Sequence, residues 1–270
     1  MVKKLFKHEF LAALRLWLPM QIILLAVALF GRIVQLFETD TTAYDIVFGS
    51  STVIYVLAIF TSLLLTMIFG IIRFYKNLFS HEGYLSFTLP VTTEQHITVK
   101  TVVAACSMLG SLLVVFISFA VFTAGEVFVE VMKAVSYLIK RFIGEFGGVN
   151  FAFYLVEGIA LVAVSLLGGF LLYYACIALG QTFKKNRVLG AVGVYFIYYT
   201  IVQIFSTVLM IIVAFWADMP FFEAIVNFID TCPEGFVHIV LIGSLVSALV
   251  MTAVYFLIVR LVIRKKLNLE

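Results

Sequence analysis

The sequence predicts an all-α polytopic membrane protein with six transmembrane helices. Hydrophobic residues make up 64% of the 270-residue chain and charged residues only 12%, whereas soluble proteins average about 45–50% and about 25%. The apolar residues gather in six runs, each close to or above the ~20 residues that a helix needs to cross a ~30 Å hydrocarbon core. Because lipid offers the backbone no hydrogen-bond partner, each run is expected to be helical.

The six spans are expected to form a single transmembrane domain over residues 1–270. An even number of spans places both termini on one side, and basic residues concentrate on the cytoplasmic side of membrane proteins. A cytoplasmic N-terminus puts 14 of the 18 Lys and Arg residues on that side. We therefore expect both termini in the cytoplasm. The predicted spans cover about residues 16–37, 52–72, 101–124, 151–180, 188–216 and 237–260.

Residues 1–15 precede the first span and are predicted to form an amphipathic helix. Val2, Leu5, Phe6 and Phe10 share one helical face, and the basic residues lie mostly on the other. This pattern is typical of an interfacial helix that lies along the inner leaflet. Pro19 then suits the first turn of the span, where a missing N–H group costs nothing.

The segment 73–100, between the second and third spans, is unusually polar and aromatic. Its sequence is RFYKNLFSHEGYLSFTLPVTTEQHITVK, and a plain connector needs only a few residues. Thr92 followed by Gln95 predicts the start of a helix that runs into the third span. We expect two short helical pieces joined at an elbow, with apolar side chains that another surface covers.

Two further helices are predicted outside the spans, on the outer surface. Over residues 126–146 apolar residues recur at helical spacing until Gly147 and Gly148 break the pattern. Asp218 before Pro220 predicts a second helix start, and the segment 218–236 is too short to cross the bilayer. This second helix is expected to be re-entrant or to lie on the surface.

Polar residues inside the spans are candidates for the substrate path or for a dimer interface. A carboxylate in hydrocarbon costs on the order of 2.5 kcal/mol or more, so Glu157 should face a cavity, a partner or an interface, or stay protonated. A hydrogen bond of purely structural value is the alternative. His238 is expected to lie alone near the end of the sixth span. The fifth span carries a polar and aromatic stripe, for which core packing is the alternative explanation: Tyr195, Tyr198, Tyr199 and Gln203.

The chain resembles the small six-span permeases of the ABC-2 type transporter family. The similarity lies in the runs Arg-Phe-Tyr-Lys-Asn, Glu-Gly-Tyr-Leu and Thr-Leu-Pro-Val before Lys100, in the basic N-terminus and in the RKKLNLE tail. His81 departs from the family pattern, which has an acidic residue there. The resemblance implies an exporter subunit in a bacterial inner (plasma) membrane, paired with a second copy or a paralogue and with two cytoplasmic ATPase subunits.

In that family the loop between the second and third spans forms a coupling helix that docks on the ATPase, and short helices between the fifth and sixth spans close the outer end. The resemblance thus implies apolar contacts at the elbow with a polar rim around them. The expected coupling residues are Arg73, Glu82, Gly83, Tyr84, Leu85, Phe87, Leu89 and Glu94. The alternative is that the aromatic residues only pack against the inner leaflet and the spans.

No catalytic or metal-binding pattern stands out. The chain lacks the G-x-x-x-x-G-K-[ST] motif, so ATP and Mg²⁺ are expected to bind in a partner subunit, with no cofactor in this one. The His-Glu pairs lack a second His at zinc-protease spacing, and the net charge of +3 gives no reason to expect nucleic acid. We therefore expect no enzyme, no metal and no nucleic-acid partner.

Two other functions compete with the exporter permease. A secondary transporter driven by an ion gradient should show internal repeats, broken helices and several intramembrane charges, and the sequence shows no convincing repeat. A non-transporting scaffold or accessory subunit would explain the spans but leaves segment 73–100 without a purpose. An ATPase that co-purifies with the chain would separate these possibilities.

Overall fold

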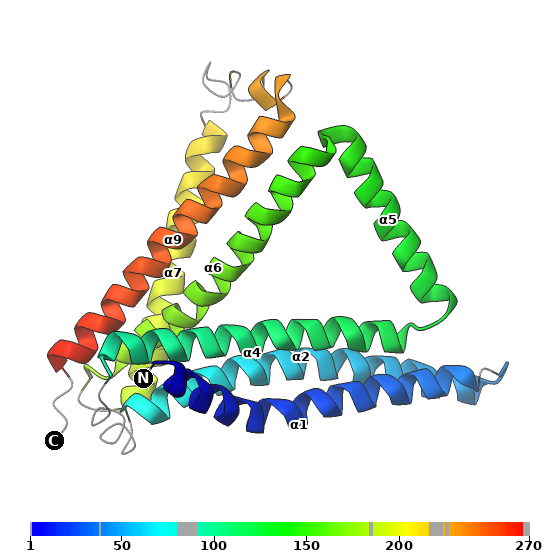
Figure 1. Ribbon diagram of the computed structural model, residues 1–270, viewed down its shortest axis with the longest axis horizontal. Helices are drawn as coiled ribbons and strands as arrows, with labels where there is room; N and C mark the ends of the chain where they lie inside the picture. Colours follow the sequence, from blue (N-terminus) through cyan, green and yellow to red (C-terminus); the bar gives the residue numbers. More distant parts are fainter. Residues whose placement is uncertain are drawn as a thin grey trace. The chain divides into compact units, whose positions relative to one another are not determined.

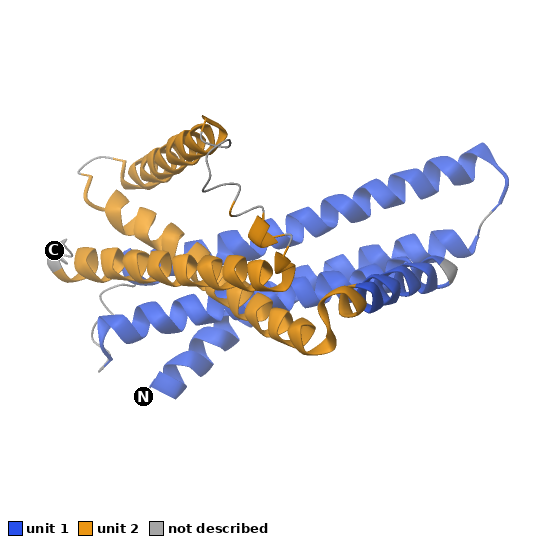
Figure 2. Cartoon of the chain, turned by 90° about the horizontal axis from the view of Figure 1, so that it is seen from above, with its two compact units in different colours: residues 1–141 blue, residues 142–270 orange. Residues whose placement is uncertain are grey.

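The protein is all-α, as the sequence predicts. The computed structural model describes residues 2–37, 39–79, 91–183, 186–215, 224, 227–229 and 231–266, and none of these lies in a strand. Six of its helices are long and apolar enough to cross a membrane (Figure 1). The chain is thus a multi-pass membrane protein. It divides into two compact units, residues 1–141 and 142–270 (Figure 2), and each is described separately.

Unit 1 contains three of the long helices. They are α1 (Val2–Leu36), α2 (Thr42–Phe79) and α4 (Thr93–Phe122), and all three pack against one another. At a rise of 1.5 Å per residue, α2 is ~57 Å long, nearly twice the thickness of a hydrocarbon core. The span predicted at 52–72 lies within α2, and those predicted at 16–37 and 101–124 end one and two residues beyond α1 and α4. All three helices begin several residues before the predicted spans.

The N-terminal segment does not form a separate helix. α1 continues from Val2 to Leu36, so Pro19 lies inside the helix and not in a first turn. The residues at the expected boundary, 12–16 (AALRL), are strong helix formers with no Gly or capping residue among them, so the helix continues across it. Pro19 is accommodated further along at the cost of one backbone hydrogen bond. The position of residues 1–15 at the membrane surface stays a prediction.

The start of α4 agrees with the sequence signal. Thr92 is its N-cap: the Thr92 hydroxyl accepts a hydrogen bond from the Gln95 N–H at 3.4 Å, and the Gln95 side chain accepts one from the Thr92 N–H at 3.1 Å. This reciprocal capping box satisfies two backbone donors that the first helical turn leaves free. It fixes the residue at which α4 begins.

A small apolar core holds the three helices of unit 1 together. Leu24 and Ala28 of α1 pack with Tyr55 of α2 and Phe122 of α4. The Tyr55 and Phe122 rings are stacked with their centroids 4.3 Å apart. Gly31 lets the Phe122 ring approach α1, because a Cβ atom there would lie 2.3 Å from Phe122 Cε2. Small residues at such crossings allow close packing where lipid supplies no hydrophobic drive.

The predicted helix over residues 126–146 is confirmed as α5 (Glu126–Phe146). It is not continuous with α4, because Gly125 has a φ of 109°, a left-handed backbone region that glycine enters at little cost. Gly147, with a φ of 79°, separates α5 from α6 in the same way. The location of α5 on the outer surface stays a prediction.

Unit 2 contains α6 (Gly148–Gly180), α7 (Arg187–Phe215) and α9 (Pro233–Lys266). α6 and α9 cover the spans predicted at 151–180 and 237–260, α7 covers the described part of the span predicted at 188–216, and α6 packs against both of the others. Pro233 is the first residue of α9, where its missing N–H group is not needed. In the segment 218–236, most residues before Cys232 lie outside the described part of the chain.

Glycines also mark the close contacts of unit 2. A Cβ atom on Gly168 of α6 would lie 2.6 Å from the Thr252 hydroxyl of α9, and one on Gly180 would lie 2.6 Å from the backbone nitrogen of Ala191 in α7. Pairs of tyrosines also join α7 to α6 and to α9. The Tyr173 and Tyr195 rings stack at 5.7 Å, and the hydroxyls of Tyr198 and Tyr255 lie 2.5 Å apart.

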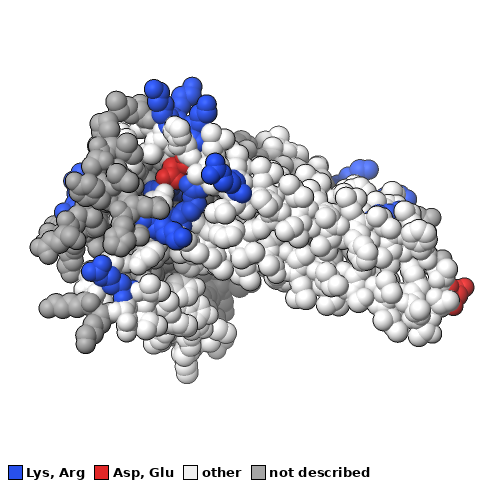
Figure 3. All heavy atoms as spheres, turned by 90° about the horizontal axis from the view of Figure 1, so that it is seen from below, with Lys and Arg blue, Asp and Glu red and all other residues white. Residues whose placement is uncertain are grey.

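The exposed surface of the long helices is apolar. Exposed side chains are dominated by Leu, Ile, Val and Phe, as expected for surfaces that face lipid rather than water. On the face drawn in Figure 3, Lys, Arg, Asp and Glu gather in a few places, and broad stretches between them carry none. The described charged groups are therefore concentrated enough to be treated as local clusters.

Candidate functional site

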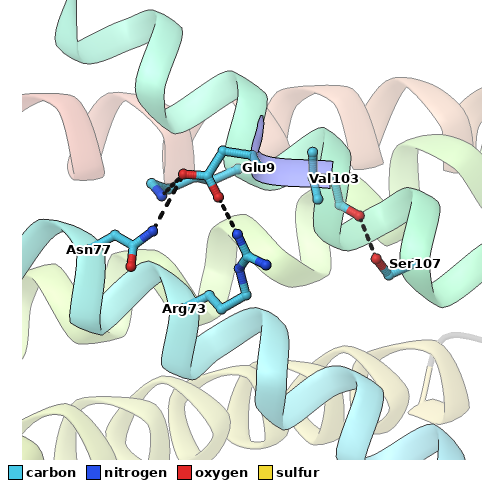
Figure 4. A network of polar contacts seen from close by, with 6 residues as sticks. Glu9, Arg73, Asn77, Val103 and Ser107 are labelled. Atoms are coloured by element: carbon cyan, nitrogen blue, oxygen red, sulfur yellow. Dashed lines mark hydrogen bonds and ion pairs between the residues drawn. The ribbon is translucent and has the colours of Figure 1, made fainter. Parts of the chain in front are cut away.

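A cluster of charged side chains joins the three helices of unit 1 at the two ends of segment 73–100. Glu9 of α1 accepts a hydrogen bond from Arg73 Nη2 of α2 at 2.5 Å, and its other oxygen pairs with the Lys100 ammonium of α4. Asn77 Nδ2 donates to the same carboxylate at 3.4 Å. Figure 4 shows Glu9 pointing between the Arg73 and Asn77 side chains.

The cluster is largely enclosed by protein. The Glu9, Arg73 and Lys100 side chains are only 12%, 19% and 5% exposed. At such a site each ion depends on its partner, because removing one charge leaves the other buried and uncompensated. Glu9 therefore ties the two ends of segment 73–100 to the N-terminal part of α1. We call these residues, with Asn77, the Glu9 cluster.

The periodicity of α1 explains why Glu9 points inward. Leu5, Phe6, Phe10 and Ala13 lie on the less exposed face of α1, and Glu9 falls on the same face by the i, i+3, i+4 rule. The Phe6 and Phe10 rings, 5.9 Å apart, flank it in sequence. The sequence analysis missed Glu9 as a site residue, although a single acid on the apolar face of an amphipathic helix was the available signal.

A second polar network lies further along the same three helices. The Ser111 hydroxyl of α4 accepts hydrogen bonds from Trp17 Nε1 at 2.7 Å and from Gln21 Nε2 at 2.9 Å, both on α1. It also lies 2.8 Å from Thr66 Oγ1 of α2, and Ser62 Oγ of α2 donates to Gln21 Oε1 at 3.3 Å. Satisfied polar networks of this kind specify how helices pair within a membrane.

The structure describes only two of the predicted coupling residues. Arg73 belongs to the Glu9 cluster, and Glu94 lies in the first turn of α4. The six others lie outside the described residues, so their role stays a prediction: Glu82, Gly83, Tyr84, Leu85, Phe87 and Leu89. Lys100, which the sequence analysis treated only as the start of the third span, joins Arg73 in the Glu9 cluster.

In unit 2, Glu157 of α6 has a partner. His238 Nδ1 of α9 lies 2.9 and 3.0 Å from the two oxygens of the Glu157 carboxylate. The two side chains are 17% and 25% exposed. The expectation that His238 lies alone is therefore wrong. It failed because residues 81 positions apart in sequence meet only when α6 and α9 pack side by side.

Other groups surround this pair. The Tyr154 ring packs on the His238 ring with centroids 4.4 Å apart, and the Tyr154 hydroxyl donates to the Glu234 carbonyl oxygen at 3.0 Å. Asn150 Nδ2 bonds the Glu234 carboxylate. The result is a set of polar links between the N-terminal parts of α6 and α9. A role of Glu157 in a substrate path or dimer interface stays a prediction.

The polar and aromatic stripe of the fifth span divides into two faces of α7. Tyr195 and Tyr198 turn towards neighbouring helices of unit 2, where they contact Tyr173 and Tyr255. Tyr199 and Gln203 are exposed instead. The structure thus does not bring the four residues together, and core packing accounts for the first two. A dimer interface at the exposed pair stays a prediction.

Among the residues that the structure describes, no group of three or more His, Cys, Asp or Glu side chains is placed to hold a metal ion. Comparison of the chain with known protein families, curated proteins and solved structures found no match.

Proposed function

We propose that the chain is the permease subunit of an ATP-binding cassette exporter of the ABC-2 type. It would form the membrane pathway, together with a second copy or a paralogue, in a bacterial inner membrane. Separate cytoplasmic ATPase subunits would bind Mg²⁺ and ATP. The proposal is supported by six helices of spanning length, by the resemblance of segment 73–100 to the coupling segment of that family, and by the absence of a P-loop motif from the sequence.

The Glu9 cluster is the observation that carries this proposal. A coupling segment must pass a push from the ATPase to the spans, which requires firm attachment at both of its ends. Arg73 and Lys100 are the first and last residues of segment 73–100, and both are held by the one carboxylate of Glu9. A displacement of the segment would therefore act on α1, α2 and α4 together.

α1, α2 and α4 also contact one another at positions further from the Glu9 cluster. Buried hydrogen bonds to Ser111 join all three, and the Tyr55 and Phe122 stack adds a third level of contact. Packed elements with several such contacts shift as a body and do not deform continuously. Closure of the ATPases on ATP would then tilt the three helices as a group.

The test is a purified native complex in mild detergent. The chain should co-purify with a subunit that carries G-x-x-x-x-G-K-[ST], and addition of Mg-ATP should change amide hydrogen exchange at the ends of α2 and α4. Glu82→Lys reverses a charge at the elbow. It should abolish that ATP-dependent change and leave membrane insertion intact, because hydrolysis is then uncoupled from the spans.

Glu130→Lys on α5 is the matched control, since it reverses the charge of an exposed acid elsewhere. It should behave as the wild type. An unchanged ATP response in Glu82→Lys would remove the coupling role. Transport by the chain alone, driven by an ion gradient, would favour a secondary transporter, and a complex that lacks both an ATPase and transport would favour a scaffold.

A further inference from the structure

The exposed face of α1 carries an unusual mixture of side chains. Lys4, His8, Leu11, Arg15 and Leu18 follow one another at helical spacing, and Lys3 and Lys7 flank them. All seven are exposed, and Leu11 and Leu18 keep about half of their surface exposed, 52% and 46%. We call this set the basic face of α1.

No acid balances the charges of the basic face from within its own segment. Glu9 is the only acidic residue in the first 15 residues, and it points to the opposite side of α1, where Arg73 and Lys100 take up its charge. Lys76 adds one more exposed cation from the last turn of α2, next to Asn77 of the Glu9 cluster. This end of unit 1 therefore has an excess of accessible positive charge.

The combination of exposed basic and leucine side chains indicates which environment suits the basic face. A surface in bulk water has no need to expose Leu11 and Leu18 on the same helical face as these cations, and a surface in hydrocarbon would exclude lysine ammonium groups. Both kinds of side chain are satisfied at the boundary between lipid headgroups and acyl chains. There leucines reach inward, and long basic side chains extend towards phosphate.

We propose that the basic face of α1 binds the headgroups of anionic phospholipids. Phosphatidylglycerol is the simplest ligand of this chemistry, because its phosphate carries a net negative charge that phosphatidylcholine cancels with its own cation. Clustered Lys and Arg beside a membrane segment attract such lipids electrostatically. The proposal concerns an interaction surface and holds whatever cargo the chain carries.

The test is lipid binding by the full-length protein in neutral detergent. Phosphatidylglycerol and phosphatidylcholine are titrated separately, and the retained lipids are counted by native mass spectrometry. The wild type should bind phosphatidylglycerol more tightly. Lys3→Gln with Lys7→Gln should weaken that binding by about tenfold or more, since each basic residue near a lipid surface strengthens attachment roughly fivefold. Binding of phosphatidylcholine should not change.

Lys133→Gln with Lys140→Gln is the matched control, because it removes two exposed charges from α5. It should leave phosphatidylglycerol binding unchanged. Equal affinity for the two lipids, or no effect of the Lys3 and Lys7 changes, would overturn the proposal. So would binding of inorganic phosphate that displaces the lipid completely, since the face would then be a site for a soluble anion.

Because both lysines are exposed, the double variant should fold normally, and its unchanged phosphatidylcholine binding verifies this. One further outcome would indicate that the basic face binds a protein and not a lipid. If the double variant binds phosphatidylglycerol as before but no longer retains the ATPase, the basic face docks an acidic protein surface and the lipid proposal fails. That outcome leaves the proposed transport function standing, so the two proposals fail separately.

Discussion

A charged side chain inside a membrane protein must be neutralised, hydrated or paired. Glu9 and Glu157 are both paired, but with different consequences. Glu9 lies between two cations on two helices, so it organises three chain segments at once. Glu157 faces one imidazole and links only α6 to α9. Loss of the Glu9 carboxylate would therefore disturb the packing of three helices, whereas loss of the Glu157 carboxylate would disturb the packing of two.

The Glu157 and His238 pair should be measurable as a coupling energy. Glu157→Gln, His238→Phe and the double variant form a double-mutant cycle, and a hydrogen bond between two membrane helices contributes about 1 kcal/mol, up to ~2 kcal/mol. The free energy of unfolding, measured in bicelles, should show this non-additivity. A second cycle that combines Glu157→Gln with Tyr255→Phe serves as the control and should be additive. Additivity in the first cycle would contradict the pairing.

Some residue-scale features could be predicted from the sequence and others could not. Arg73 was among the expected coupling residues, and Glu157 stood out because an acid in an apolar run is expensive. Their partners did not, since Glu9 to Lys100 and Glu157 to His238 are contacts between helices distant in sequence. Single-helix periodicity says which face a residue occupies and leaves open which neighbour it meets.

At the scale of elements, hydropathy finds the apolar middle of a helix better than its ends. The span predicted at 52–72 lies inside α2, which continues for several turns on both sides, because polar residues extend a helix as easily as apolar ones. Helix ends that carry a capping residue or a glycine could be predicted from the sequence. The capping box at Thr92 and Gln95 marked the start of α4, and Gly147 marked the end of α5.

The contact between α6 and α7 depends on glycine. Gly180→Ala should lower the free energy of unfolding by about 1–3 kcal/mol, because its Cβ atom would lie 2.6 Å from backbone atoms of Ala191, which cannot rotate away. Gly158→Ala, in the same helix with nothing within 4 Å, is the control. It should be neutral or stabilising by up to ~1 kcal/mol. Equal stability of both variants would contradict this account of the contact.

For the whole molecule, orientation in the membrane decides how the units can be used. Charge placement predicts that both termini and segment 73–100 face the cytoplasm and that α5 lies outside. Unit 1 then presents the Glu9 cluster and the basic face of α1 to the cytoplasmic side. The proposed coupling role depends on this orientation, so it is the first property to establish.

Cysteine labelling can establish the orientation. With Cys106, Cys176 and Cys232 replaced by serine, Lys76→Cys should react with a membrane-impermeant maleimide only in inside-out vesicles, whereas Tyr137→Cys on α5 should react in intact cells. Both positions are exposed, so access to the reagent depends on the side of the membrane. Labelling of Lys76→Cys in intact cells would invert the topology and exclude a cytoplasmic coupling segment.

The length of α2 has a mechanical consequence. It is one unbroken rod from Thr42 to Phe79, with Arg73 and Asn77 of the Glu9 cluster close to one tip and Tyr55 and Ser62 nearer its centre. When α2 tilts together with α1 and α4, such a rod moves its two ends in opposite directions. At 1.5 Å per residue, a tilt of about 10° would carry each tip through roughly 5 Å in opposite directions.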